Sequence, residues 1–137
     1  LIVEDDAAQG KAYAEALSRA GYQATLIGSS AKALTVAQRQ EFHCLVVDCM
    51  LPKMNGVDLV EELLEQMIQR PKVFLVSGIF KDRNFVKEAV DKTGALNFLF
   101  KPFPVNELVQ AVDDAFEALL DDDEPPLLSL YSSTALN

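Results

Sequence analysis

Short apolar runs alternate along the chain with longer segments in which apolar residues recur every three or four positions. The runs are Leu1–Val3, Ala24–Ile27, Phe42–Val47, Val73–Val76 and Leu96–Phe100. Runs of this length predict strands. Leu45, Val46 and Val47 are apolar without interruption, which is typical of a strand covered on both faces.

The segments between and after these runs have the period of a helix. Their apolar stripes are Tyr13, Ala16, Leu17 and Ala20; Ala33, Val36 and Ala37; Val60, Leu63, Leu64 and Met67; Val86, Ala89, Val90 and Thr93; and Val105, Leu108, Val109, Val112, Phe116 and Leu119. Gly21 and Pro71 are expected to end the first and third segments, and Ser29 or Ser30 to cap the second.

Strands that alternate with helices predict an α/β fold with right-handed crossovers and helices on both faces of a parallel sheet. Five such units fit a flavodoxin-like, doubly wound five-stranded sheet of order 2-1-3-4-5 with five helices. We expect this domain to cover residues 1–120. Residues 121–137 begin with acids and prolines, which favours a linker. The rest of this tail, up to Asn137, could either begin an output domain or pack against the domain before it.

Composition narrows the class of protein. The 137 residues are 50% hydrophobic and 24% charged, the balance of a soluble globular domain. The net charge of −9 argues against direct binding of nucleic acid. No apolar stretch of about 18 residues is present, so we expect no membrane span and a cytoplasmic protein.

Polar residues stand where four of the predicted strands end. Glu4 and Asp5 follow the first run, Asp48 the third, Ser77 the fourth and Lys101 the fifth. The ends of parallel strands emerge at one edge of the sheet, so these side chains are expected to converge. Three carboxylates and one lysine leave a charge of −2, which a Mg²⁺ ion with retained waters would balance.

Such a site is suited to phosphoryl transfer. A carboxylate such as Asp48 can attack phosphorus and form an acyl phosphate. The transferred group needs charge neutralisation more than proton chemistry. Mg²⁺ and Lys101 would supply it, and the Ser77 hydroxyl can donate a hydrogen bond to a phosphoryl oxygen.

Four motifs give these residues a family context. In order along about residues 1–120, they are Val3-Glu4-Asp5-Asp6, Val46-Val47-Asp48-Cys49-Met50-Leu51-Pro52-Lys53-Met54-Asn55-Gly56, Leu75-Val76-Ser77-Gly78 and Phe100-Lys101-Pro102-Phe103. Their order and spacing resemble the receiver domain of bacterial two-component response regulators.

The resemblance implies a role for each matched position around the metal. Glu4 and Asp5 correspond to the acidic pair that holds Mg²⁺. Asp48 corresponds to the phosphoacceptor, which also ligates the metal. Met50 corresponds to the position whose backbone carbonyl completes the metal site.

The resemblance also implies a switch. Ser77 corresponds to the switch hydroxyl, Lys101 to the phosphate-binding lysine and Phe98 to the aromatic residue that rotates inward. The Lys101-Pro102 bond is cis in similar proteins. Two departures affect the signalling face: the stretch from Ser77 to Lys101 is about two residues longer than in the best-known chemotaxis receiver, and residues 78–83 form an unusual entry to the fourth helix.

The expected function is therefore a phosphorylation-dependent signalling switch. A histidine kinase or phosphotransfer protein would donate the phosphoryl group to Asp48, and slow self-hydrolysis would reset it. The chain would otherwise not be an enzyme. The fourth helix, fifth strand and fifth helix would read out the change, through an output domain beyond residue 137 or a homodimer.

Two other functions deserve comparison. A phosphatase of the haloacid dehalogenase type needs a second acid two residues after its nucleophile, and Met50 stands there instead. A receiver-like module that binds partners without phosphorylation usually lacks an acid or the lysine, and neither is missing. Cys44 is expected to pack within a strand, and nothing near Cys49 would lower its pKa enough for redox chemistry.

Overall fold

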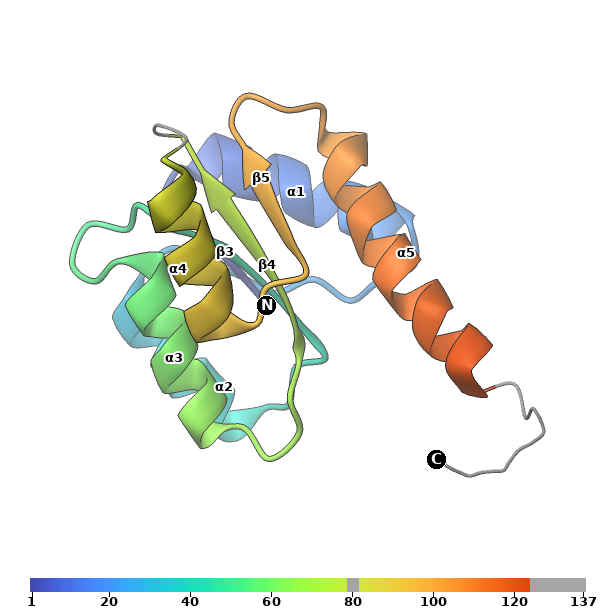
Figure 1. The fold of residues 1–137 in the computed structure, drawn as a ribbon, viewed down its shortest axis with the longest axis horizontal. Helices are drawn as coiled ribbons and strands as arrows, with labels where there is room; N and C mark the ends of the chain where they lie inside the picture. Colours follow the sequence, from blue (N-terminus) through green and yellow to red (C-terminus); the bar gives the residue numbers. More distant parts are fainter. Residues whose placement is uncertain (79–81, 124–137) are drawn as a thin grey trace.

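Five parallel strands form a single sheet in the order β2-β1-β3-β4-β5, which confirms the predicted fold. The computed structural model describes residues 1–78 and 82–123, shown in Figure 1. The strands are β1 (Ile2–Val3), β2 (Leu26–Ile27), β3 (Cys44–Asp48), β4 (Lys72–Ser77) and β5 (Asn97–Phe100). The helices are α1 (Ala7–Arg19), α2 (Ser30–Arg39), α3 (Gly56–Gln66), α4 (Arg83–Thr93) and α5 (Val105–Asp123).

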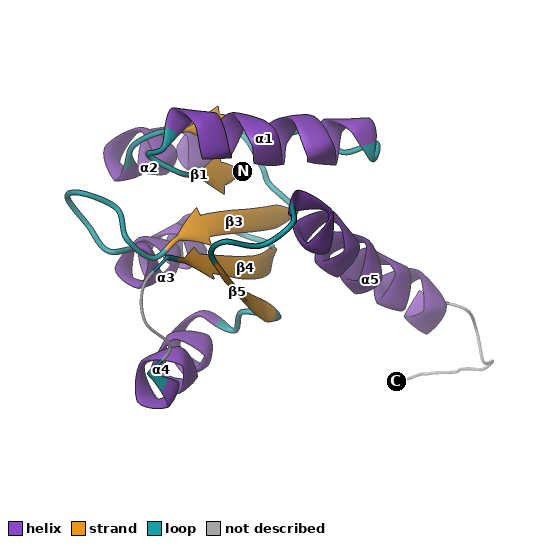
Figure 2. Cartoon of the chain, turned by 90° about the horizontal axis from the view of Figure 1, so that it is seen from above, coloured by secondary structure: helices purple, strands orange, loops and turns teal. Residues whose placement is uncertain are grey.

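Helices cover both faces of the sheet. Figure 2 shows α1 and α5 on one side of the strands and α2, α3 and α4 on the other. Residues of the central strands alternate between two apolar clusters: Val47 and Leu75 pack with α3, whereas Val46 and Phe74 pack with α1 and α5. This double burial explains why the strands have continuous apolar sequences.

Polar side chains begin the first four helices. Asp6, Ser29, Asn55 and Asp82 each accept a hydrogen bond from a backbone N–H in the first turn of α1, α2, α3 and α4, respectively. Such bonds satisfy donors that the helix itself leaves unpaired. The cap of α2 is therefore Ser29 and not Ser30.

Several boundaries differ from the sequence predictions. The second strand is shorter than Ala24–Ile27, and the third is shifted towards Asp48, because Asp48 pairs with Val76 of β4. Helix α3 ends at Gln66, before Pro71, so the proline does not terminate it. Helix α5 continues through Asp123, so no extended linker begins at Asp121. Residues 79–81 and the predicted tail, 124–137, lie outside the described residues.

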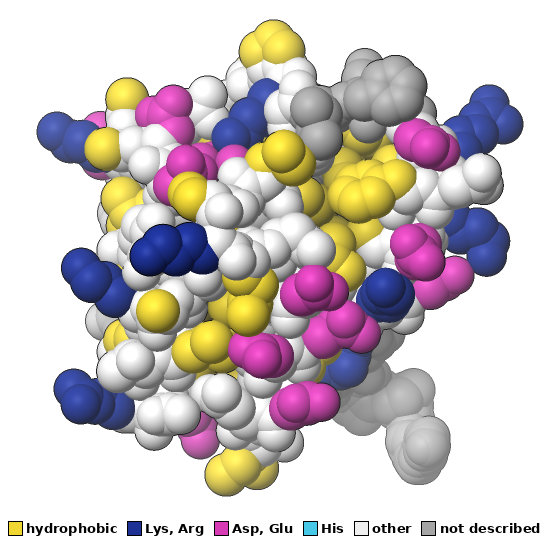
Figure 3. All heavy atoms as spheres, turned by 90° about the vertical axis from the view of Figure 1, so that its left-hand side faces the viewer, with side chains coloured by type: hydrophobic (Ala, Val, Ile, Leu, Met, Phe, Trp, Pro, Cys, Tyr) yellow, Lys and Arg dark blue, Asp and Glu magenta, His cyan; other side chains and the backbone are white. Residues whose placement is uncertain are grey.

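The surface is rich in acids. Figure 3 looks onto the side of the molecule that carries α3 and α4, and it shows acidic side chains gathered on that side. The exposed acids of these two helices are Asp58, Glu62, Glu65, Glu88 and Asp91. Within the described parts of the chain, no helix is both long and apolar enough to cross a membrane.

Candidate phosphoryl-acceptor site

The polar residues predicted from the strand ends meet at one edge of the sheet. Glu4 directly follows β1, Asp48 and Ser77 are the last residues of β3 and β4, and Lys101 directly follows β5. The register aligns these ends, since Asp48 pairs with Val76 and Ser77 pairs with Phe100. Parallel pairing therefore brings together residues that are far apart along the chain.

The Lys101 ammonium joins two buried carboxylates. Its Nζ lies 2.8 Å from Glu4 Oε1 and 2.8 Å from Asp48 Oδ2. The side chains of Glu4 and Asp48 are only 2% and 5% exposed, respectively. A buried carboxylate needs such a partner, because removal from water penalises its charge.

Charge within this group is not balanced. Burial raises the pKa of Glu4 to about 7, the neighbouring Asp48 adds to the effect, and the hydrogen bond from Lys101 opposes it. Burial lowers the pKa of Lys101, but the hydrogen bonds to Asp48 and Glu4 outweigh it and raise the pKa overall. One ammonium thus pairs with two carboxylates, and additional positive charge would stabilise the ionised form of both.

A third carboxylate completes a candidate cation site. Ligand oxygens of Glu4, Asp5 and Asp48 all lie within 4.8 Å of one another, with Asp5 exposed and the other two buried. Carboxylate oxygens open to water on one side are the ligands that Mg²⁺ favours. This donor set and its excess negative charge fit the predicted Mg²⁺.

The backbone around Asp48 forms a tight turn. The Met50 N–H donates a hydrogen bond to Asp48 Oδ1 over 2.8 Å, a contact that sequence reasoning missed. The Gly56 N–H donates to the Cys49 carbonyl over 2.9 Å. A Cβ at Gly56 would lie 2.1 Å from the Asp48 carbonyl oxygen, so only glycine allows this close approach.

The predicted switch residues occupy the neighbouring strands. Ser77 is buried at the end of β4, and its carbonyl accepts a hydrogen bond from the Lys101 N–H over 2.8 Å. Phe98 is half-buried on β5, outside the acidic cluster. Its ring meets Phe85 of α4 edge-on at 6.2 Å and lies 5.0 Å from Phe100. The Lys101-Pro102 peptide bond is cis.

Both cysteines pack among apolar residues. Cys44 begins β3, as predicted, and packs against the cluster under α1 and α5. Burial, with a contribution from Asp48, raises the pKa of Cys49 to about 12. A thiol of that pKa carries almost no thiolate at neutral pH, which agrees with the prediction that nothing near Cys49 lowers its pKa.

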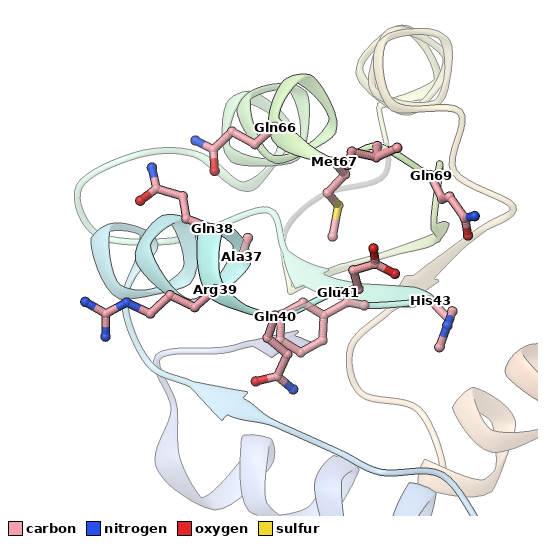
Figure 4. A pocket seen from close by; sticks show the side chains of 11 residues that line it. Ala37, Gln38, Arg39, Gln40, Glu41, His43, Gln66, Met67 and Gln69 are labelled. Atoms are coloured by element: carbon pink, nitrogen blue, oxygen red, sulfur yellow. The ribbon is translucent and has the colours of Figure 1, made fainter.

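A separate hollow of about 480 Å³ lies away from the site formed by Glu4, Asp5 and Asp48. Figure 4 shows that its side chains come from the end of α2, the segment leading into β3, the end of α3 and the segment after α3. These segments lie at the opposite ends of the strands. None of the residues that line it belongs to the predicted site.

Comparison with known families decides the classification. Residues 1–113 match the family described as response regulator receiver domain. The chain belongs to this family. It is therefore a receiver domain of two-component signalling systems, a family that is not enzymatic in the usual sense. That assignment sets aside the dehalogenase-type phosphatase.

Individual proteins support the assignment. The transcriptional regulatory protein PcoR of Escherichia coli is 33% identical over 82% of this chain and 48% of its own length. The probable chemotaxis protein CheY of Rhizobium etli is 28% identical over 87% of this chain and 92% of its own. This receiver thus spans about half of PcoR and nearly all of the CheY protein.

A solved structure provides a further comparison. The response regulator protein from Burkholderia pseudomallei with a phosphorylated aspartic acid, calcium ion and citrate superposes with a TM-score of 0.72. It is 25% identical, and the match covers 94% of this receiver and 76% of that chain.

Proposed function

We propose that this receiver is a switch that accepts a phosphoryl group on Asp48. The supporting observation is the convergence of Glu4, Asp5, Asp48 and Lys101 at one edge of the sheet. Three carboxylates and one ammonium give a net charge of −2, which a bound Mg²⁺ would neutralise. The phosphorylated aspartic acid named for the Burkholderia pseudomallei protein supports the same chemistry here.

In this mechanism the donor is a phosphohistidine of a histidine kinase or phosphotransfer protein. A carboxylate oxygen of Asp48 forms a bond to phosphorus while the phosphorus–nitrogen bond of the donor breaks. Mg²⁺ bound by Glu4, Asp5, Asp48 and the Met50 backbone carbonyl would neutralise charge on the transferred group. Hydrolysis of the acyl phosphate by water resets the switch.

Lys101 and Ser77 stabilise the phosphorylated state in this proposal. Lys101 exchanges its bond to a carboxylate for one to a phosphoryl oxygen, and Ser77 donates its hydroxyl to another. Their movement biases two conformations of the domain. Phe98 follows Ser77 and rotates inward, away from the edge-on contact with Phe85.

The signal leaves through α4, β5 and α5 in this proposal. Phe85 and Leu96 are 36% and 55% exposed beside this surface, which suits a homodimer or an output domain. PcoR is about twice as long as the matched segment, which supports a receiver joined to an output domain. We further propose that residues 1–120 are the switching unit, that 121–137 connect it to its output, and that the protein acts in the cytoplasm.

The test is phosphorylation by a small-molecule donor. Wild-type protein and Asp48→Asn are incubated with Mg²⁺ and acetyl phosphate, and their intact masses are measured. We expect a labile gain of one phosphoryl group in the wild type alone. No gain in either protein, together with no binding of Mg²⁺, would refute the switch and leave a module that binds partners without phosphorylation.

A further inference from the structure

Lys101 lies at the start of a segment that lacks ordinary backbone anchors. The Lys101 N–H is bonded to the Ser77 carbonyl, but Pro102 and Pro104 have no N–H to donate. Both prolines are also exposed. The next backbone bond that the structure records here runs from the Glu107 N–H to the Pro104 carbonyl, where α5 begins. The path of this segment therefore depends on the Phe103 side chain.

Phe103 is held by an aromatic stack. Its ring lies 5.7 Å from that of Tyr13, with an interplanar angle of 15°. Tyr13 is only 6% exposed and belongs to the cluster formed by α1, α5 and the strands beneath them. Stacked rings of this kind stabilise a contact beyond the contribution of the area that they bury.

Helix α1, which carries Tyr13, is also bonded to Glu4 of the site. Asp6 caps α1, and its N–H donates to Glu4 Oε2 over 3.2 Å. Tyr13 lies about two turns further along the same helix. The charges of the site reach its phenol. Burial is the main cause that raises the Tyr13 pKa, the charge of Lys101 acts to lower it, and the charge of Glu4 acts to raise it.

We propose that the stack of Tyr13 on Phe103 positions Lys101 relative to the carboxylates. Helix α1 fixes the loop that carries Glu4 and Asp5, and the stack fixes the segment after Lys101 against the same helix. This inference rests on the proposed function, because it assigns positioning residues to the phosphoryl-acceptor site. In this proposal, neither ring contacts the transferred group.

The chain offers a matched control for simple packing. Tyr22 and Phe116 form a second aromatic pair, with ring centres 6.0 Å apart, that joins the segment before β2 to α5. Tyr22 also donates a 2.5 Å hydrogen bond to Asp113. This pair belongs to the same cluster as Tyr13, and the bonds described for it run to α5 and not to the strand-end residues of the site. Phe116→Leu should therefore weaken packing without moving Lys101.

The experiment compares Tyr13→Leu, Tyr13→Phe, Phe103→Leu and Phe116→Leu with the wild type. Three quantities are measured: Mg²⁺ affinity by calorimetry, beryllofluoride affinity in saturating Mg²⁺, and the phosphorylation rate with acetyl phosphate. Beryllofluoride is an analogue of the phosphoryl group. In the proposed mechanism its binding depends on Lys101 but requires no phosphoryl transfer. Urea unfolding gives the free energy of unfolding of each variant, so that variants with similar losses of stability can be compared.

We expect Tyr13→Leu and Phe103→Leu to lower beryllofluoride affinity and phosphorylation rate by about fivefold or more, since small displacements of a charged group weaken such contacts strongly. Mg²⁺ affinity should change less than about twofold, because the metal ligands do not include Lys101. Tyr13→Phe keeps the stack and should behave as wild type, and Phe116→Leu should keep both affinities.

Two results would overturn the positioning role while leaving the switch intact. One is a Tyr13→Leu variant that loses no more beryllofluoride affinity than Phe116→Leu does. The other is a parallel loss of Mg²⁺ affinity, which indicates general damage to the site. A wild type that binds neither beryllofluoride nor a phosphoryl group refutes the proposed function itself, and the inference with it.

Discussion

The Glu4 carboxylate lies where burial and charge act against each other. It accepts hydrogen bonds from the Lys101 ammonium and the Asp6 N–H, yet burial still raises its pKa to about 7. An ordinary glutamate has a pKa near 4.5. In the metal-free protein Glu4 therefore binds a proton more tightly when folded than when unfolded.

The first prediction concerns this proton. Between about pH 4.5 and 7 the folded state holds the Glu4 proton and the unfolded state releases it, so stability falls as pH rises. We expect the Glu4 contribution to the free energy of unfolding to fall by about 1–3 kcal/mol over this window. Urea unfolding in EDTA at pH 5 to 8 measures it.

Glu4→Gln should flatten this dependence, and Glu65→Gln, at an exposed position of α3, should leave it unchanged. Saturating Mg²⁺ should remove the dependence near pH 7, because the cation replaces the proton. Parallel pH curves for Glu4→Gln and the wild type would show that Glu4 does not titrate in this range.

At the scale of elements, the turn between β3 and α3 determines how the acceptor is presented. Met50 bonds to the Asp48 carboxylate, and Gly56 begins α3 directly against the Asp48 backbone. Asn55 caps the helix at the same point by accepting the Asp58 N–H over 2.9 Å. The turn and the helix start thus form one unit with the acceptor.

The second prediction tests this close approach. Gly56→Ala would place a methyl group 2.1 Å from the Asp48 carbonyl oxygen, so the turn must move. We expect a loss of at least about 3 kcal/mol in the free energy of unfolding, measured by urea titration, and slower phosphorylation. At Gly28 the nearest atom to a new Cβ would be 3.9 Å away. Gly28→Ala should therefore cost less than about 1 kcal/mol, and equal losses would refute the steric argument.

At the scale of the whole molecule, the site joins segments that span most of the chain. Lys101 is bonded to residues 97 and 53 positions away in sequence, Glu4 and Asp48. A ligand that binds only this assembled arrangement stabilises the entire fold. Mg²⁺ binding should therefore raise the free energy of unfolding of the whole domain.

The third prediction uses this linkage. At a Mg²⁺ concentration of about 100 times Kd, the free energy of unfolding should rise by about 2.7 kcal/mol. Asp5→Asn should reduce this gain by about 1 kcal/mol or more, because it removes a charged ligand that lies on the surface. Asp91→Asn, an exposed change on α4, is the control. An equal gain in both variants would exclude Asp5 from the metal site.

Three features could be predicted from the amino-acid pattern alone: the fold class, the sheet order and the convergence of the acids with Lys101. This was possible because strand and helix periods, and the rule that parallel strands end at one edge, depend only on local pattern and connectivity. The ends of the helices were predicted less well: α3 ends before Pro71 and α5 continues past Asp121, because packing and caps determine where a helix ends.

Other contacts became visible only in the folded protein. These are the pairing of Lys101 with both buried carboxylates, the hydrogen bond from the Met50 N–H to Asp48, and the stack of Tyr13 on Phe103. Those contacts join residues distant in sequence or depend on the exact turn, and side-chain geometry of that kind leaves no periodic signal in the chain.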